Sequence, residues 1–205
     1  MTKALNQLFD LRLTPKAVIK HAREIHNRAQ DSSGSGFDII TSFEEGRTLS
    51  CRILDNGAYD YEHVELPETI KIFVVINDEY AKTSEMIDRY KAAKNKYRDY
   101  FSQHAPKMKN ELENLHHSII NKDNKSILQY LSKYNELLVD MDKNFNLGVF
   151  INHHELSKFA KDEGVFYKPS GSGGGDIGLL ISDDEIRLDS VCKKLKSKGV
   201  HLFEI

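Results

Sequence analysis

One segment carries most of the information in this chain: Lys168-Pro169-Ser170-Gly171-Ser172-Gly173-Gly174-Gly175-Asp176-Ile177-Gly178. Closely spaced glycines let successive backbone N–H groups approach an anion, because no Cβ atom stands in the way. The hydroxyl groups of Ser170 and Ser172 add hydrogen-bond donors. The composition therefore predicts an anion-binding loop, and the alternative interpretation is a flexible glycine linker or a tight turn.

Two common nucleotide-binding loops do not fit this segment. A Walker A loop ends in Gly-Lys-Ser or Gly-Lys-Thr, and the segment lacks this ending. Gly173, Gly175 and Gly178 match the spacing GxGxxG, but the Rossmann motif follows a strand and opens a helix. Here Ile177–Ile181 is predicted to be a strand that leaves the loop, so the Rossmann interpretation fails on context.

The residues after the loop predict one more helix and one more strand. Ser182 and Glu185 form a capping-box pair, which indicates the start of a helix. Gly199 suits the position just after the end of that helix, and Val200–Ile205 is predicted to be a strand. The side chains expected to face inward from the helix are those of Leu188, Val191, Cys192 and Leu195.

The first part of the chain alternates helical and extended patterns. Thr14-Pro15 predicts a helix start, and residues 31–36 are rich in helix breakers. Thr48–Leu54 and Ile70–Ile76 are predicted strands, and the second is typical of a strand covered on both faces. Residues 83–164 have helical spacing. This order predicts an α+β domain with helices on one face of an antiparallel sheet.

Composition excludes several classes of protein. The 205 residues carry a formal net charge of −2, which argues against electrostatic binding to nucleic acid. No apolar run approaches the roughly 20 residues of a membrane span, and Met1–Gln30 does not read as a signal peptide. Cys51 and Cys192 are interpreted as reduced, buried thiols. We therefore expect a cytoplasmic protein with neither a membrane nor a nucleic-acid partner.

The sequence contains two histidine clusters, and histidine is a common metal ligand. His116-His117 and His153-His154-Glu155 lack both i,i+4 ligand spacing and a Cys-x-x-Cys companion, and His154-Glu155 is not part of an HExxH motif. We interpret both clusters as solvated helix faces and expect no metal ligand in the chain.

Two motifs resemble one enzyme family. The segment 168–176 closely resembles the third conserved motif of the GHMP kinases, and its Lys-Pro-Ser start and Gly-Gly-Gly-Asp end resemble the phosphomevalonate kinases in particular. His26, Gln30 and Gly34-Ser35-Gly36-Phe37-Asp38 resemble the "H…Q…GSG-x-D" stretch of that family, which carries its catalytic aspartate. The resemblance runs from about Ala4 to Ile205.

The resemblance implies a fold and a division of the chain. The fold class is α+β, the C-terminal portion of a two-domain GHMP kinase, with a ferredoxin-like antiparallel sheet covered by helices. Residues 1–66 would be a remnant of the N-terminal, ribosomal S5-like domain, and residues 67–205 would be the C-terminal domain. The implied activity is ATP-dependent phosphorylation of a small molecule, with Mg²⁺.

The resemblance also implies site residues. Asp38 would be catalytic, although a loop aspartate often only caps a turn. The residues implied to bind the ATP phosphates are Ser170, Gly171, Ser172, Gly173, Gly174 and Gly175. Those implied to bind substrate are Ser35, Lys168, Asp176 and Ser84. Ser84 could instead cap a helix together with Thr83, and Lys168 could point to solvent.

The family's other phosphate-binding loop, of the type Pro-x-x-x-Gly-Leu-Gly-Ser-Ser-Ala, does not occur in this sequence. Phosphoryl transfer depends mainly on positioning and electrostatics, so such a loop matters. Three hypotheses follow: a separate N-terminal kinase fragment completes the enzyme; the chain is an inactive binding or regulatory module; or the chain acts alone. The expected partners are a small-molecule substrate and either such a fragment or a second copy in a homodimer. The expected acceptor is phosphomevalonate, and mevalonate or another small alcohol is the alternative.

Overall fold

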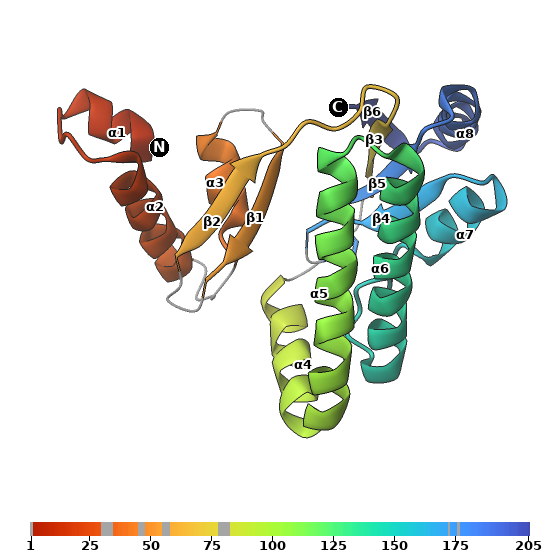
Figure 1. Ribbon diagram of the computed structural model, residues 1–205, viewed down its shortest axis with the longest axis horizontal. Helices are drawn as coiled ribbons and strands as arrows, with labels where there is room; N and C mark the ends of the chain where they lie inside the picture. The colour runs from red at the N-terminus through yellow and green to blue at the C-terminus, as the bar shows by residue number, and fades with distance from the viewer. Residues whose placement is uncertain are drawn as a thin grey trace. The chain divides into compact units, whose positions relative to one another are not determined.

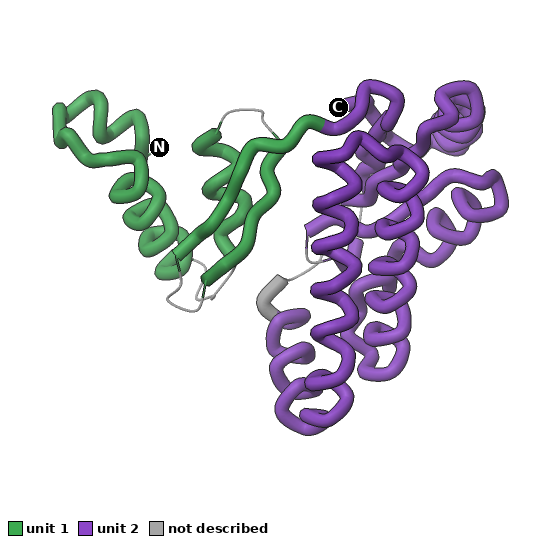
Figure 2. Tube along the Cα trace, viewed as in Figure 1, with its two compact units in different colours: residues 1–65 green, residues 66–205 purple. Residues whose placement is uncertain are grey.

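A computed structural model describes residues 2–29, 35–44, 48–54, 58–77, 83–171, 173–175 and 177–205, without the side chains of Thr83 and Ser84 (Figure 1). The chain divides into two compact units, residues 1–65 and residues 66–205 (Figure 2).

The described residues of unit 1 form three helices and a two-stranded antiparallel sheet. The elements are α1 (Thr2–Leu8), α2 (Pro15–Ala29), α3 (Phe37–Phe43), β1 (Leu49–Ile53) and β2 (Tyr59–His63). Thr14 caps α2 as predicted, since its Oγ1 accepts a hydrogen bond from the Ala17 N–H at 3.3 Å. In the sheet, Cys51 pairs with Tyr61. The pattern analysis predicted β1 but neither α3 nor β2.

Unit 2 is built on a four-stranded antiparallel sheet in the order β4-β5-β3-β6. The strands are β3 (Lys71–Ile76), β4 (Phe166–Pro169), β5 (Ile177–Ser182) and β6 (His201–Glu204). The predicted strands that correspond to β3, β5 and β6 are confirmed. Strand β4 was not predicted, because Lys168 and Pro169 were assigned to the loop, whereas Pro169 pairs with Gly178.

In the described part of unit 2, five helices accompany this sheet: α4 (Thr83–Lys96), α5 (Arg98–Ile120), α6 (Asn124–Phe145), α7 (His154–Asp162) and α8 (Glu185–Ser197). Helices α7 and α8 pack on the sheet face that carries Val75 and Leu180. Helices α5 and α6 pack on the opposite face, against Ile181 and its neighbours (Figure 1). The prediction of helices on one face was therefore wrong. The β5 side chains on both faces of the sheet are apolar, so helices must cover both faces.

The core between the sheet and helices α7 and α8 contains fully buried residues from every layer. Leu180 and Val75 are 0% exposed, and Leu188 is 1% exposed. All four apolar residues predicted to face inward from α8 are buried. Cys192 is among them, and burial raises its pKa to about 11, which makes the thiol unreactive. Cys51 is only half-buried.

Two local predictions need correction. Helix α8 is capped by Asp184, whose carboxylate accepts from the Arg187 N–H at 3.0 Å, while Ser182 accepts from the N–H of Asp184. The capping carboxylate lies closer to the helix than the predicted Ser182, because β5 continues through that serine. His153 is also not solvated: it is 0% exposed, and its Nδ1 lies 2.7 Å from the hydroxyl of buried Tyr167.

Strands β4 and β5 approach closely where they meet the glycine segment. Tyr167 packs over Gly178, and a Cβ atom on that glycine would collide with the tyrosine hydroxyl. Tyr167 pairs with Leu180 and therefore lies diagonally across from Gly178. Within the described ranges, no helix is long and apolar enough to cross a bilayer.

Truncation of the core at β5 should be costly. Leu180→Ala is expected to lower the free energy of unfolding by about 2–5 kcal/mol, because it leaves a cavity between the sheet and helices α7 and α8. Ile186→Ala is the control, since that side chain is 85% exposed and its loss should change stability by less than about 0.5 kcal/mol. Urea denaturation followed by circular dichroism measures both variants. Equal losses would contradict the assigned core.

Candidate functional site

The Asp38 region begins with a left-handed turn. Gly36 has φ 72° and precedes α3, where the N–H groups of Ile39 and Ile40 point back to its carbonyl oxygen. Tyr59 lies so close that a Cβ atom on Gly36 would collide with the tyrosine hydroxyl. This position therefore needs glycine for both its backbone conformation and its space. The turn places Asp38 in the first turn of α3.

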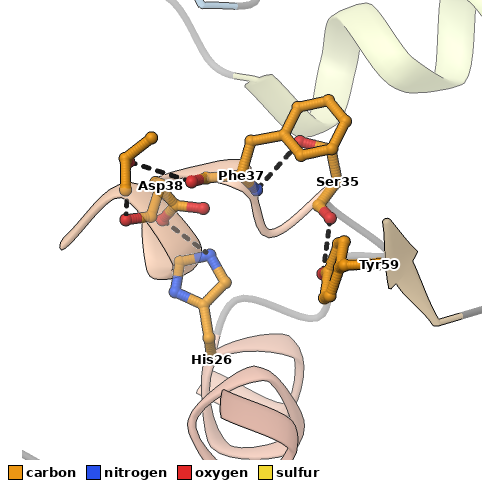
Figure 3. A network of polar contacts seen from close by, with 6 residues as sticks. His26, Ser35, Phe37, Asp38 and Tyr59 are labelled. Carbon is orange, nitrogen blue, oxygen red and sulfur yellow. Dashed lines mark hydrogen bonds and ion pairs between the residues drawn. The ribbon is translucent and has the colours of Figure 1, made fainter. Parts of the chain in front are cut away.

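Polar contacts connect this turn to α2 and β2 (Figure 3). The Tyr59 hydroxyl donates to the Ser35 carbonyl oxygen at 2.7 Å, and the Ser35 Oγ lies 3.5 Å from the Phe37 N–H. Thr41 donates to the carbonyl oxygens of Phe37 and Asp38. Burial raises the pKa of Tyr59, and the negative charge of Asp38 raises it further, while Arg23 opposes both effects.

Asp38 itself is an accessible carboxylate with a histidine neighbour. Its side chain is 64% exposed, and its Oδ2 lies 3.8 Å from Nε2 of His26 on α2 (Figure 3). Such a carboxylate can accept a proton or hold a cationic group beside an acceptor. His26 and Asp38 both belong to the "H…Q…GSG-x-D" stretch and are 12 positions apart in sequence (38 − 26). The fold brings their side chains together.

The glycine segment forms the connection between β4 and β5 in unit 2. Gly171, Gly173, Gly174 and Gly175 all have positive φ values. The loop is closed by a hydrogen bond from the Ser170 N–H to the Ile177 carbonyl oxygen at 2.9 Å, and Gly173 donates to the Ser170 carbonyl oxygen. Backbone N–H groups of such turns can bind an anion where they are not already donated within the protein.

One side of this loop is attached to a neighbouring turn and another side is open. The Gly174 N–H donates to the Val149 carbonyl oxygen at 2.8 Å, and Asn152 Nδ2 donates to the Gly174 carbonyl oxygen at 3.0 Å. A Cβ atom built on Gly171 would meet nothing within 4 Å. A ligand can therefore approach the loop at Gly171 without displacing a described residue.

Lys168 supplies a positive charge at the base of the loop. It lies in β4, and its Nζ donates to the Pro169 carbonyl oxygen at 2.7 Å. Burial lowers the pKa of Lys168, because the charged ammonium group is partly removed from water. A bound anion would restore the electrostatic stabilisation that water no longer gives.

The predicted site residues are divided between the two units, and some of them lie outside the described residues. Ser35 and Asp38 come together in unit 1, whereas Lys168, Ser170, Gly171 and the glycines 173–175 come together in unit 2. Ser172 and Asp176 lie outside the described residues. Ser84 lies in the first turn of α4, with its side chain outside the described part.

Sequence reasoning missed the residues that hold the glycine loop. Asn152 contacts the loop directly, and the buried Asp142 holds the turn that carries Val149. Asn152 lies 22 positions before Gly174, too far for any local pattern to join them. Asp142 offered one signal: it directly follows Met141 on the apolar stripe of its helix, where an unpaired carboxylate would be costly.

No protein-family model matches the sequence, and no curated protein matches it. The fold is nevertheless shared with solved structures. The Lin0012 protein from Listeria innocua is 16% identical, with a TM-score of 0.86 over 98% of this chain and 62% of that one. Phosphomevalonate kinase from Streptococcus pneumoniae, solved with phosphomevalonate and AMPPNP, is 17% identical, with a TM-score of 0.79 over 99% of this chain and 65% of that one.

Mevalonate kinase from L. major, solved with R-mevalonate, is 18% identical, with a TM-score of 0.76 over 98% of this chain and 61% of that one. This chain therefore spans between 61% and 65% of the length of these three structures. The predicted α+β fold with antiparallel sheets is therefore confirmed, and it is shared with these two kinases.

The lowered pKa of Lys168 predicts a pH dependence of stability. The unfolded chain holds this proton up to about pH 10.5, whereas the folded protein releases it at lower pH. Between these two pKa values the unfolded state binds more protons, so stability rises with pH and the cost of the buried charge disappears. Lys168→Met should therefore be more stable than wild type at pH 7, and this advantage should shrink as the pH approaches 10.5.

The measurement is urea denaturation of both proteins from pH 7 to 10.5. Lys193→Met, at an exposed position of α8, controls for the loss of one positive charge. A Lys168→Met advantage that is absent at pH 7 would contradict the buried charge.

Proposed function

We propose that this chain provides the glycine-loop part of an ATP-dependent small-molecule kinase of the GHMP type. The observation that carries the proposal is the β4–β5 loop, with four positive-φ glycines and Lys168 at its base. Among the described residues, the amide groups of Gly171 and Gly175 have no protein acceptor. We assign these two donors to a phosphate group of the nucleotide.

ATP supplies the γ-phosphoryl group when bound, and Mg²⁺ is expected to accompany it. We assign Mg²⁺ no ligand among the described residues. Within the chain, Gly171 and Gly175 orient the phosphate through their N–H groups, and Lys168 balances its charge. Ser170 and the glycines between them line the same path, as their place in the loop suggests.

Asp38 acts at the acceptor in this proposal. Its exposed carboxylate can orient an acceptor oxygen, and His26 can hold the carboxylate in place when the imidazole is protonated. If the acceptor is a hydroxyl group, Asp38 takes its proton as the new P–O bond forms and ADP leaves. If the acceptor is a phosphate, most of it is already ionised at neutral pH, and orientation becomes the larger part of the role.

Phosphomevalonate is the acceptor that we propose, giving diphosphomevalonate and ADP. Two observations support it: the Lys-Pro-Ser start and the Gly-Gly-Gly-Asp end of the loop, and the similarity of the fold to a phosphomevalonate kinase solved with that compound. Mevalonate is the alternative, because a mevalonate kinase has a similar TM-score. Since the matched kinases are longer, we propose the activity for this chain together with a further N-terminal kinase segment.

The test is ADP release from MgATP with mevalonate, phosphomevalonate or diphosphomevalonate. It should be run with the chain alone and with an added N-terminal segment of a GHMP kinase. Turnover with phosphomevalonate supports the proposal, and turnover with mevalonate alone corrects the acceptor. Binding of MgAMPPNP without turnover in any mixture would favour a non-catalytic binding module.

Removal of the Asp38 charge should stop the reaction and spare the fold. Asp38→Asn is expected to lower kcat by about 10²- to 10⁴-fold, because the group that accepts a proton or orients the acceptor is lost. Asp60→Asn is the matched control: Asp60 is also in unit 1 and half-exposed, and its partner is Arg52 rather than the proposed site. ADP release measures both, and an unimpaired Asp38→Asn enzyme would refute the assignment.

A further inference from the structure

We infer that Asp142 is a positioning residue that fixes the glycine loop through a single peptide plane. Asp142 lies near the end of α6, and its side chain is buried. Its importance for catalysis rests on the proposed function, because the loop is there the phosphate-binding element. Its effect on the position of the loop does not depend on that function.

The carboxylate of Asp142 accepts three backbone hydrogen bonds from the turn after α6. Its Oδ1 accepts from the N–H groups of Gly148 and Val149 at 2.7 and 3.0 Å. Its Oδ2 accepts from the N–H of Phe150 at 2.9 Å. Hydrogen bonds to an ionised acceptor are stronger than those between neutral groups. Three of them on one buried carboxylate leave the turn little freedom to rotate.

The bond to Phe150 reaches the glycine loop directly. The N–H of Phe150 and the C=O of Val149 belong to the same planar peptide unit and point to opposite sides of it. Asp142 holds the N–H side of this unit, and the Gly174 N–H donates to the C=O side at 2.8 Å. A carboxylate on the N–H side also polarises the carbonyl group, which strengthens its bond to Gly174.

A second contact makes the attachment specific for Gly174. Asn152, from the same turn, donates its side-chain N–H to the Gly174 carbonyl oxygen at 3.0 Å. Both backbone groups of Gly174 are thus held by the segment that Asp142 organises. The amides assigned to phosphate, those of Gly171 and Gly175, belong to the same loop. Their orientation therefore depends on how Gly174 is held.

Asp142 is not itself placed to touch a ligand. It is 8% exposed, and both carboxylate oxygens are occupied by backbone N–H groups. Its role is therefore transmitted through the peptide unit between Val149 and Phe150. This separates it from Asp38, whose carboxylate is exposed.

The first test is amide hydrogen exchange of the full chain, followed by NMR. Asp142→Asn keeps the shape of the side chain but has one acceptor oxygen in place of two. Exchange at Gly174 is expected to accelerate about tenfold or more, while exchange at Val191 in α8 stays within about twofold. Asp140→Asn is the matched control on the same helix, since Asp140 accepts from the Tyr100 hydroxyl rather than from the turn after α6 and should leave Gly174 unchanged.

Two results would overturn the inference: unchanged exchange at Gly174 in Asp142→Asn, or equal acceleration at Gly174 and Val191, which would indicate a general loss of stability. A measurement on the wild-type chain covers the case in which the variant does not fold. Scalar coupling across the hydrogen bond from Gly174 nitrogen to Val149 carbonyl carbon should be detectable, and its absence would remove the proposed connection.

Binding of MgAMPPNP separates this inference from the proposed function. Asp142→Asn should weaken binding by about tenfold or more, because a misplaced loop aims its N–H groups away from the phosphate. Asp140→Asn should bind like wild type. If wild type does not bind, the proposed function fails and the exchange data alone decide the role of Asp142. If wild type and Asp142→Asn bind equally, the inference fails and the proposed function stands.

Discussion

The pairing of β5 with both of its neighbours is the interaction on which unit 2 depends. The strand is hydrogen-bonded to β3 on one edge and to β4 on the other, and each of its faces carries a helical layer. An apolar strand in this position resists displacement, since moving it would expose both cores to water. The glycine loop leads directly into β5. Its C-terminal end is therefore anchored by a strand that is packed on both faces.

The residues proposed for the two roles differ in their surroundings. Lys168 is held in a strand and is partly desolvated, whereas Asp38 lies in a short helix and is exposed. A partly desolvated cation at the base of a glycine-rich loop favours an anion over neutral ligands, because only an anion offsets the cost of its desolvation. The exposed carboxylate suits the other role, at a small acceptor that must enter and leave. The roles that we propose for them, at the nucleotide phosphate and at the acceptor, follow from these different surroundings.

Much of the fold could be predicted from local patterns, and the failures have physical causes. Strand β3 and helix α8 were identified because their apolar residues follow clear periods. Strand β2, Tyr-Asp-Tyr-Glu-His, was missed because its residues are mostly polar. Motif resemblance identified Asp38 and the loop, but no local signal could join Asp142 to Gly174, since that connection exists only once the chain is folded.

The packing of Tyr167 over Gly178 also fixes the alignment of the two strands that flank the loop. Glycine is the one residue type there that leaves room for the ring. If β4 slid along β5 by two residues, the ring would meet the side chain of Leu180 in place of Gly178. The close approach of Tyr167 to Gly178 therefore opposes this slip, and the register of β4 and β5 sets the separation of the two ends of the loop.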